Sequence, residues 1–201
     1  SDGAFVMNNG ELNISATDDG LKSGASVTVN NGTINVTKSF EGMESIFINI
    51  NGGVTNLLAS NDGINTSYGT VSGGTESNDG SSLTVSGGVL IVTGSDGVDV
   101  NGNFFIKGGT TIVSGNEGID INGNFIISGG TIISSGPNSN MTKSMSTSST
   151  QVSMFIKSTS SLAATSLIHI EDAAGKDLVT YKPRSAAAIF HFSSPSLAKN
   201  T

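Results

Sequence analysis

The chain has 201 residues, enough for one large domain or two small ones, and it carries a net charge of −7 with only 12% charged residues. This acidic balance argues against nucleic-acid binding, because phosphates require clusters of Lys and Arg. Cysteine is absent, which excludes disulfides and thiolate metal sites, and no run approaches the ~18 apolar residues of a membrane span.

Glycine recurs at a fixed interval along the first two-thirds of the chain. The turn glycines Gly10, Gly32, Gly53, Gly88, Gly109 and Gly130 are separated by 22, 21, 35, 21 and 21 residues. A second set, Gly20, Gly42, Gly63, Gly97 and Gly118, follows an acidic residue each time and keeps the same register. The single long step contains a Gly- and Ser-rich insertion at about residues 68–82. Two independent markers therefore indicate an internal repeat of 21 to 22 residues.

Apolar residues alternate with polar ones inside each repeat. This period of two, rich in β-branched residues and bounded by Gly and Asn, predicts short β-strands. The pairs that we expect to face the core are Val27/Val29, Ile34/Val36, Ile48/Ile50, Leu83/Val85, Leu90/Val92, Phe104/Ile106 and Phe125/Ile127.

A repeat of this length cannot bury its own apolar face, whereas stacked copies share one continuous core. We therefore predict an all-β fold, a parallel β-helix with coils of 21 to 22 residues over residues 1–138. Its expected handedness is right-handed, the usual sense of parallel crossovers.

The repeat ends near Gly136, and residues 139–201 are predicted to form a linker and a cap of antiparallel β-strands. Strand-like runs lie at residues 152–156, 167–170, 178–181 and 188–192, and residues 171–176 suit a hairpin turn. Such a cap would cover the open end of the coil stack.

Acidic and polar residues form two columns if the coils stack in register, with successive members ~4.8 Å apart. The first column is Asp19, Glu41, Asp62, Asp96 and Glu117, and the second is Lys22, Glu44, Asn65, Asp99 and Asp120. Like charges on adjacent coils repel unless something offsets them.

Calcium would offset this repulsion, because Ca²⁺ takes six to eight oxygen ligands in flexible arrangements. We expect one ion at Glu41, Glu44, Asp62 and Asn65, another at Asp96, Asp99, Glu117 and Asp120, and a third near Asp18 and Asp19. Lys22 is expected to replace a cation near the end of the columns. The alternative is a solvated turn face without an ion, since Asp-Gly alone is a common turn.

Several stretches carry a resemblance to a known family: TKSFEGME at residues 37–44, SNDGIN at 60–65, the SGGT repeats, and HIEDAAGKDLVTYKP with FSSPSL near the C-terminus. They resemble a family of bacterial carbohydrate-binding β-helix proteins that bind polygalacturonate and cellulose and are similar in fold to family 9 pectate lyases. The resemblance implies a right-handed parallel β-helix, several Ca²⁺ ions on the acidic columns and an extracellular setting. Since that family usually carries a further N-terminal portion, we expect this chain to be a shortened form.

The function expected on these grounds is non-catalytic, calcium-dependent binding of acidic plant cell-wall polysaccharide, with cellulose as a further ligand. The partner is then an acidic polysaccharide bridged through Ca²⁺, and the setting is extracellular or the bacterial cell surface. Lys38, Phe40 and Tyr68 are the candidate carbohydrate-binding residues, because they offer a cation and rings on which sugars stack.

Two alternatives remain open at the level of sequence. The first is a pectate lyase-like β-elimination in which Lys38 removes the proton α to a uronate carboxylate. The second is a structural surface adhesin in which Ca²⁺ only staples the coils. The isolated His169 and His191 are expected to be satisfied strand residues rather than metal ligands.

Overall fold

The computed structural model describes residues 3–69 and 77–199, and within these ranges the chain forms nineteen β-strands and no helix. The part of the predicted insertion at residues 70–76 lies outside the described residues. None of the described residues belongs to a helix long and apolar enough to cross a membrane.

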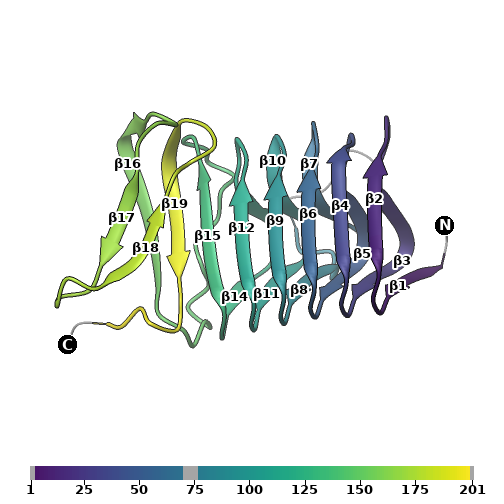
Figure 1. Ribbon diagram of the computed structural model, residues 1–201, viewed down its shortest axis with the longest axis horizontal. Coiled ribbons are helices and arrows are strands. Elements are labelled where there is room, and N and C mark those ends of the chain that lie inside the picture. The colour runs from purple at the N-terminus through teal and green to yellow at the C-terminus, as the bar shows by residue number, and fades with distance from the viewer. Residues whose placement is uncertain (1–2, 70–76, 200–201) are drawn as a thin grey trace.

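Most strands belong to two parallel sheets that wind into a coil stack (Figure 1). Sheet A contains β1 (Ala4–Met7), β3 (Leu21–Val29), β5 (Met43–Ile50), β7 (Asp62–Thr66), β8 (Ser82–Val85), β10 (Asp96–Val100), β11 (Asn103–Ile106), β13 (Ile119–Ile121) and β14 (Phe125–Ile127). Sheet B contains β2 (Glu11–Ser15), β4 (Thr33–Lys38), β6 (Val54–Leu58), β9 (Val89–Thr93), β12 (Thr110–Ser114) and β15 (Thr131–Gly136). It is extended by the antiparallel strands β19 (Ala187–Ser193) and β16 (Ser153–Leu162).

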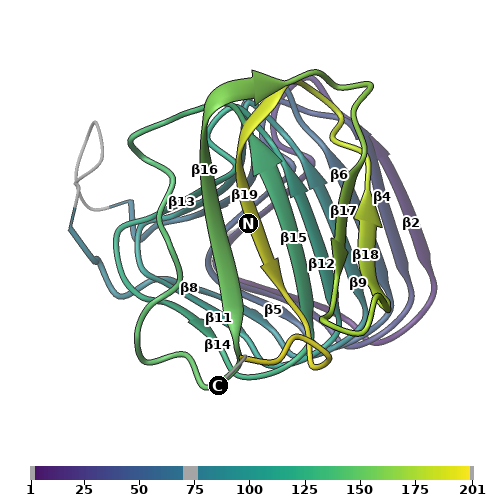
Figure 2. The same ribbon diagram turned by 90° about the vertical axis from the view of Figure 1, so that its left-hand side faces the viewer.

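The coil stack is a right-handed parallel β-helix, as the sequence predicts. In Figure 2, seen from the C-terminal end, the path from β13 through β14 to β15 runs counter-clockwise while the chain advances toward the viewer. Partners in neighbouring coils lie about one repeat apart, for example Leu12 with Ile34 and Ile34 with Thr55.

The core lies inside the coils, where the alternating apolar residues meet. All seven predicted core pairs are buried, and Phe104 and Phe125 stack in adjacent coils with ring centroids 5.0 Å apart. The residue between the two members of each pair is only partly buried, even where it is apolar, as at Ile91, Phe105 and Ile126. The period of two therefore predicts correctly which face of each strand is internal.

The insertion divides sheet A. The first half of the long strand β5, at Met43 to Ser45, pairs with β7, whereas its second half, from Phe47 to Ile50, pairs with β8 on the far side of the insertion. Later coils keep this division, since β10 and β11 are separate strands joined through Asn101 and Gly102.

The last coil is closed by two different segments. The irregular connection after β15 donates backbone hydrogen bonds to sheet A, from Lys143 N to Ile119 O (3.1 Å) and from Ser146 N to Phe125 O (2.6 Å). Its Met145 packs against the main core. The edge of β15 is covered instead by β19, so the antiparallel strands cap sheet B and the connection caps sheet A.

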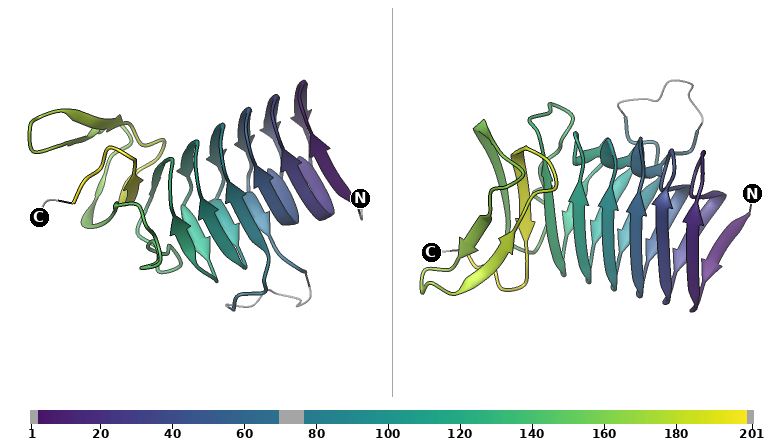
Figure 3. Two further views of the ribbon diagram at one scale, coloured as in Figure 1. Left: turned by 90° about the horizontal axis from the view of Figure 1, so that it is seen from below. Right: turned by 45° about the horizontal axis from the view of Figure 1, so that its top comes forward.

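The remaining strands, β17 (Ile168–Glu171) and β18 (Asp177–Tyr181), form the predicted hairpin. Both views of Figure 3 show β16 to β19 gathered at the C-terminal end of the coil stack. The Tyr181 hydroxyl fastens the hairpin to sheet B, because it lies 3.1 Å from both Ser114 Oγ and Ser135 Oγ.

Candidate functional site

The two polar columns lie where strands of sheet B end and those of sheet A begin; we call them the acidic edge. Their members are in the predicted register: Lys22 is opposite Glu44, Glu44 opposite Asn65, Asn65 opposite Asp99, and Asp99 opposite Asp120. Asp62 is opposite Asp96 in the other column.

The glycines after the first four acids of the first column, Gly20, Gly42, Gly63 and Gly97, let the coils approach closely at this edge. Gly20 N donates to Glu41 O (2.8 Å) and Gly42 N donates to Asp62 O (2.9 Å). A Cβ at Gly42 would lie 2.3 Å from the Gly63 carbonyl oxygen, so this position excludes a side chain. The recurrence of Asp-Gly and Glu-Gly is therefore a packing requirement that also fixes the acids above one another.

The N-terminal part of the acidic edge brings three carboxyl groups together. One oxygen from each of Asp19, Glu41 and Glu44 lies within 4.8 Å of the others. The Lys22 ammonium pairs with Asp19 Oδ2 at 2.9 Å and also with Glu44 Oε2. Hydrogen bonds to Glu44 and then Asp19 raise the pKa of Lys22 above its usual value. Lys22 thus supplies a positive charge at the place where the sequence predicts it to replace a cation.

Two neighbouring acids have strongly altered acidity. Burial, followed by the charge of Glu44, raises the pKa of Glu41 to about 7. Burial, followed by the charges of Asp99 and Glu41, raises the pKa of Asp62 to about 8. Without a cation, these carboxyl groups therefore retain protons near neutral pH.

Two buried oxygens at this place lack a hydrogen-bond donor. Asn65 Nδ2 donates to Glu41 Oε1 at 3.3 Å, which leaves Glu41 Oε2 and Asn65 Oδ1 buried and without a partner among the described residues. Buried acceptors of this kind cost free energy unless a proton donor or a cation satisfies them.

The C-terminal part of the edge is more open. Burial and the neighbouring Glu117 raise the pKa of Asp96. Glu117 Oε1 accepts a hydrogen bond from Ser139 Oγ at 3.0 Å. The backbone of Asp120 forms an isolated antiparallel β-bridge with Thr142 of the capping connection. Within the described ranges, only Asp19, Glu41 and Glu44 bring three acid groups within 4.8 Å of one another. The second predicted ligand set, Asp96, Asp99, Glu117 and Asp120, therefore lies in the predicted columns, but no three of its carboxyl groups come that close together. Asp18, expected near the third ion, is exposed.

The candidate carbohydrate-binding residues are exposed but do not form one platform. Lys38 ends β4 with its side chain in solvent, and Phe40 is 50% exposed in the next turn. Tyr68 packs edge-to-face on Phe47, with ring centroids 5.8 Å apart. Phe47 belongs to sheet A, so the exposed aromatic pair lies on a different face from Lys38.

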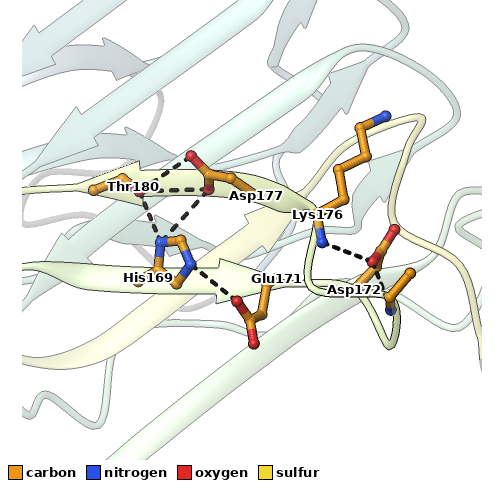
Figure 4. A network of polar contacts seen from close by, with 7 residues as sticks. His169, Glu171, Asp172, Lys176, Asp177 and Thr180 are labelled. Carbon is orange, nitrogen blue, oxygen red and sulfur yellow. Dashed lines mark hydrogen bonds and ion pairs between the residues drawn. The ribbon is translucent and has the colours of Figure 1, made fainter.

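Both histidines are held within the cap strands. His169 contacts Thr180 Oγ1 (2.9 Å) and Glu171 Oε2 (3.3 Å) on the hairpin surface (Figure 4). His191 is fully buried beside Phe125 and Phe155, its Nε2 donates to Lys143 O at 2.8 Å, and burial lowers its pKa to about 4. Both ring nitrogens of His169 thus have partners, as predicted, whereas His191 Nδ1 is buried without a hydrogen-bond partner among the described residues, so the expectation of a satisfied side chain does not hold fully for His191.

A feature that sequence reasoning missed is a groove on the outer face of sheet B. Its lining brings Asn35 and Asn56 from neighbouring coils together with Arg184 of the β18–β19 connection. Arg184 is more than 120 residues from Asn56 along the chain, and no local pattern reports how the cap docks.

Comparison with known proteins supports a carbohydrate-related assignment. Residues 1–132 match the family model described as carbohydrate-binding domain-containing protein. No curated protein matches the chain, and no solved structure matches it. The match covers most of the coil stack and more than half of the chain. The protein therefore belongs to the family of carbohydrate-binding domain-containing proteins.

Proposed function

We propose that the protein binds acidic polysaccharide of the polygalacturonate type through Ca²⁺ held at the acidic edge. Membership of a carbohydrate-binding family supports a non-catalytic role with a polysaccharide partner. The calcium dependence and the acidic ligand rest on the chemistry of the edge and on the resemblance of KSFEGME and NDGIN described above.

The observation that carries the proposal is the pair of buried, unpartnered oxygens, Glu41 Oε2 and Asn65 Oδ1, beside the gathered carboxyl groups. Carboxylate and amide oxygens are the ligands that Ca²⁺ prefers, at about 2.3–2.6 Å. Glu41, Glu44 and Asn65 would hold the ion, with Asp62 or Asp19 completing the protein ligands. The residues present fit this cation better than a zinc site, since the edge offers neither His nor Cys.

Binding of the polymer would follow from incomplete coordination by the protein. Ca²⁺ accepts six to eight oxygens, so positions taken by exchangeable water remain for uronate carboxylates. The protein residues fix where the cation sits, and the spacing of the coils sets the spacing of successive ions along the edge. We extend the proposal to a secreted or cell-surface bacterial setting, where weak extracellular calcium sites are common.

The test is binding of polygalacturonate by wild-type protein in Ca²⁺ and in EDTA. Wild type is expected to bind strongly in Ca²⁺ and to lose most of this binding in EDTA. The double variant Glu41→Gln/Glu44→Gln should bind in Ca²⁺ only as well as wild type does in EDTA. A matched control, Glu171→Gln on the exposed hairpin, removes a negative charge far from the edge and should bind like wild type.

Unchanged binding in EDTA would show that the ion does not bridge protein and polymer. Calcium-dependent melting without binding to any glycan would favour the structural adhesin instead. The lyase alternative gains no support from Lys38, because its side chain is exposed to solvent and not desolvated as in lysines that act as bases. Incubation with polygalacturonate and Ca²⁺ is expected to give no unsaturated product above that of a Lys38→Ala variant.

A further inference from the structure

The outer face of sheet B carries a ladder of asparagine side chains. Asn13, Asn35 and Asn56 are opposite one another in β2, β4 and β6. Asn56 Nδ2 donates to Asn35 Oδ1 (2.8 Å), and Asn35 Nδ2 donates to Asn13 Oδ1 (3.0 Å). The ladder ends where Asn13 Nδ2 donates to Glu11 Oε1 (2.7 Å).

This direction of hydrogen bonding leaves groups available to a ligand. Each amide has two N–H donors and the ladder uses one of them. At the other end, Asn56 Oδ1 accepts no hydrogen bond from the described residues, because its neighbour in β9 is the apolar Ile91. The ladder thus presents both donors and an acceptor toward solvent, as recognition of hydroxyl groups requires.

A groove of about 390 Å³ runs over this ladder. Its lining also includes the side chains of Leu58, which is 44% exposed, and Ile91, which together give it an apolar floor. A second hollow of about 190 Å³ shares Thr37 and Leu58 with the first and continues it to Lys38. Because they share these two residues, the hollows adjoin, and we call them together the groove, with Arg184 in the lining of the first and Lys38 in the lining of the second.

Positive charge borders the groove in two places. Arg184, the single arginine of the chain, lines it from the β18–β19 connection, and Lys38 lines the continuation at the end of β4. Within the described part of the chain, neither side chain forms an ion pair or a hydrogen bond. In a protein with a net charge of −7, two unpaired cations on one groove complement a ligand with negative charges.

We propose that this groove is a second saccharide subsite, which binds a uronate-containing chain without calcium. Arg184 would take one uronate carboxylate in a bidentate hydrogen bond and Lys38 another. The apolar floor at Leu58 and Ile91 would accept the C–H face of a sugar ring, and the amides of Asn35 and Asn56 would bind hydroxyl groups. The inference deepens the proposed function, on which it rests for the class of ligand.

The groove adds a feature that the family match does not contain. Arg184 lies beyond residues 1–132, so the cap of this chain completes a subsite whose remaining residues belong to the coil stack. A polymer in the groove leaves it at Lys38, next to the turn that leads to Glu41, and one chain can therefore reach both the groove and the acidic edge.

The test measures binding of a short oligogalacturonate in EDTA, where the acidic edge does not contribute through calcium. Wild type is expected to show weak residual binding, and Arg184→Gln and Lys38→Gln should each weaken it about tenfold, because each removes a charge-assisted contact. The control Lys157→Gln, an exposed lysine on β16, makes the same change in net charge and should bind like wild type.

Two further probes define the ligand class. An uncharged oligosaccharide of the same length should bind more weakly than the oligogalacturonate and should not respond to Arg184→Gln. Polyglutamate should not compete, since it offers carboxylates without sugar hydroxyls. Equal competition by polyglutamate would overturn the saccharide assignment in favour of an acidic peptide. Absence of binding in EDTA, or equal effects of Arg184→Gln and Lys157→Gln, would overturn the subsite.

The two proposals fail independently in this design. Loss of the calcium-dependent part in Glu41→Gln/Glu44→Gln tests the acidic edge, and loss of the EDTA-resistant part in Arg184→Gln tests the groove. Melting temperatures of all variants confirm that they fold, which is expected because Arg184 and Lys38 are exposed.

Discussion

At the scale of single residues, Lys22 shows how the acidic edge balances part of its own charge. Its ammonium lies between Asp19 and Glu44, in the column where the later coils have Asn65, Asp99 and Asp120. The N-terminal end of the edge therefore has a built-in cation, whereas the following coils have acids and an amide without one. This difference favours Glu41 to Asn65 as the place where an added ion stabilises the protein most.

Replacing Lys22 by Gln should lower the free energy of unfolding in EDTA by about 0.5–1 kcal/mol, the usual contribution of a partly exposed ion pair. Calcium should reduce this loss, because the ion can neutralise Asp19 and Glu44 in place of the ammonium. Thermal unfolding with and without Ca²⁺ measures both effects. Lys176→Gln in the hairpin turn is the control, and an equal loss in both conditions for Lys22→Gln would contradict this role.

At the scale of elements, the coils approach one another most closely at the glycine columns. Gly42 has an ordinary backbone conformation, and a side chain is excluded there by its neighbours: an added Cβ would lie 2.3 Å from the Gly63 carbonyl oxygen of the next coil and 3.1 Å from Leu57 Cβ. Gly10 presents the opposite case, since its φ is +102° and nothing lies within 4 Å of an added Cβ. A substitution at Gly42 therefore tests steric exclusion, and a substitution at Gly10 tests backbone strain.

Gly42→Ala should therefore destabilise the protein more than Gly10→Ala. The first change forces two coils apart at the acidic edge, and we expect a loss of about 3 kcal/mol, in the range of overpacked cores. The second should cost about 1 kcal/mol, the penalty of a left-handed conformation for a residue with a Cβ. Chemical denaturation measures both losses, and a larger loss for Gly10→Ala would show that packing between coils is looser than the structure indicates.

Much of the architecture could be predicted from the sequence because the repeat carries two independent signals, the position of the turns and the alternation of apolar residues. The turn glycines set the coil length and the alternating pairs, such as Ile48 and Ile50, set the inward face, so strand positions and column register followed together. The division of sheet A could not be predicted, because it depends on how one insertion interrupts the pairing of β5. The pairing of Tyr68 with Phe47 and the arrival of Arg184 over sheet B are contacts between distant segments, which no local periodicity encodes.

At the scale of the whole molecule, the negative charge is unevenly placed. Acids concentrate along one edge of the coil stack, whereas the two unpaired cations discussed above border the groove on sheet B. In a solenoid each coil contacts mainly its neighbours, so repulsion at the edge acts on every interface that the columns cross. The stability of the whole stack should therefore depend on the protonation state of a few buried carboxyl groups.

This dependence predicts how the metal-free protein responds to pH. Glu41 and Asp62 have pKa values near 7 and 8 in the folded state, against ordinary values of 4.5 and 3.8. The folded protein binds more protons than the unfolded chain between these limits, so the free energy of unfolding should fall as the pH rises from about 4 to about 8. His191 acts in the opposite sense, because its pKa is lowered to about 4 from 6.5 and stability is lost as the pH falls below 6.5.

Below pH 6.5, the two acids and His191 change the free energy of unfolding in opposite directions. Between pH 6.5 and about 8, of these three groups only the two acids change it. Denaturation of the protein in EDTA across this upper window should show stability decreasing with pH, and Asp62→Asn should flatten the decrease because the amide cannot ionise. Added Ca²⁺ should remove the decrease in wild type. Burial alone disfavours the ionised form of these carboxyl groups, whereas a bound cation stabilises it. A flat profile in EDTA, or a decrease that Asp62→Asn leaves intact, would mean that these carboxyl groups are better solvated than their burial indicates.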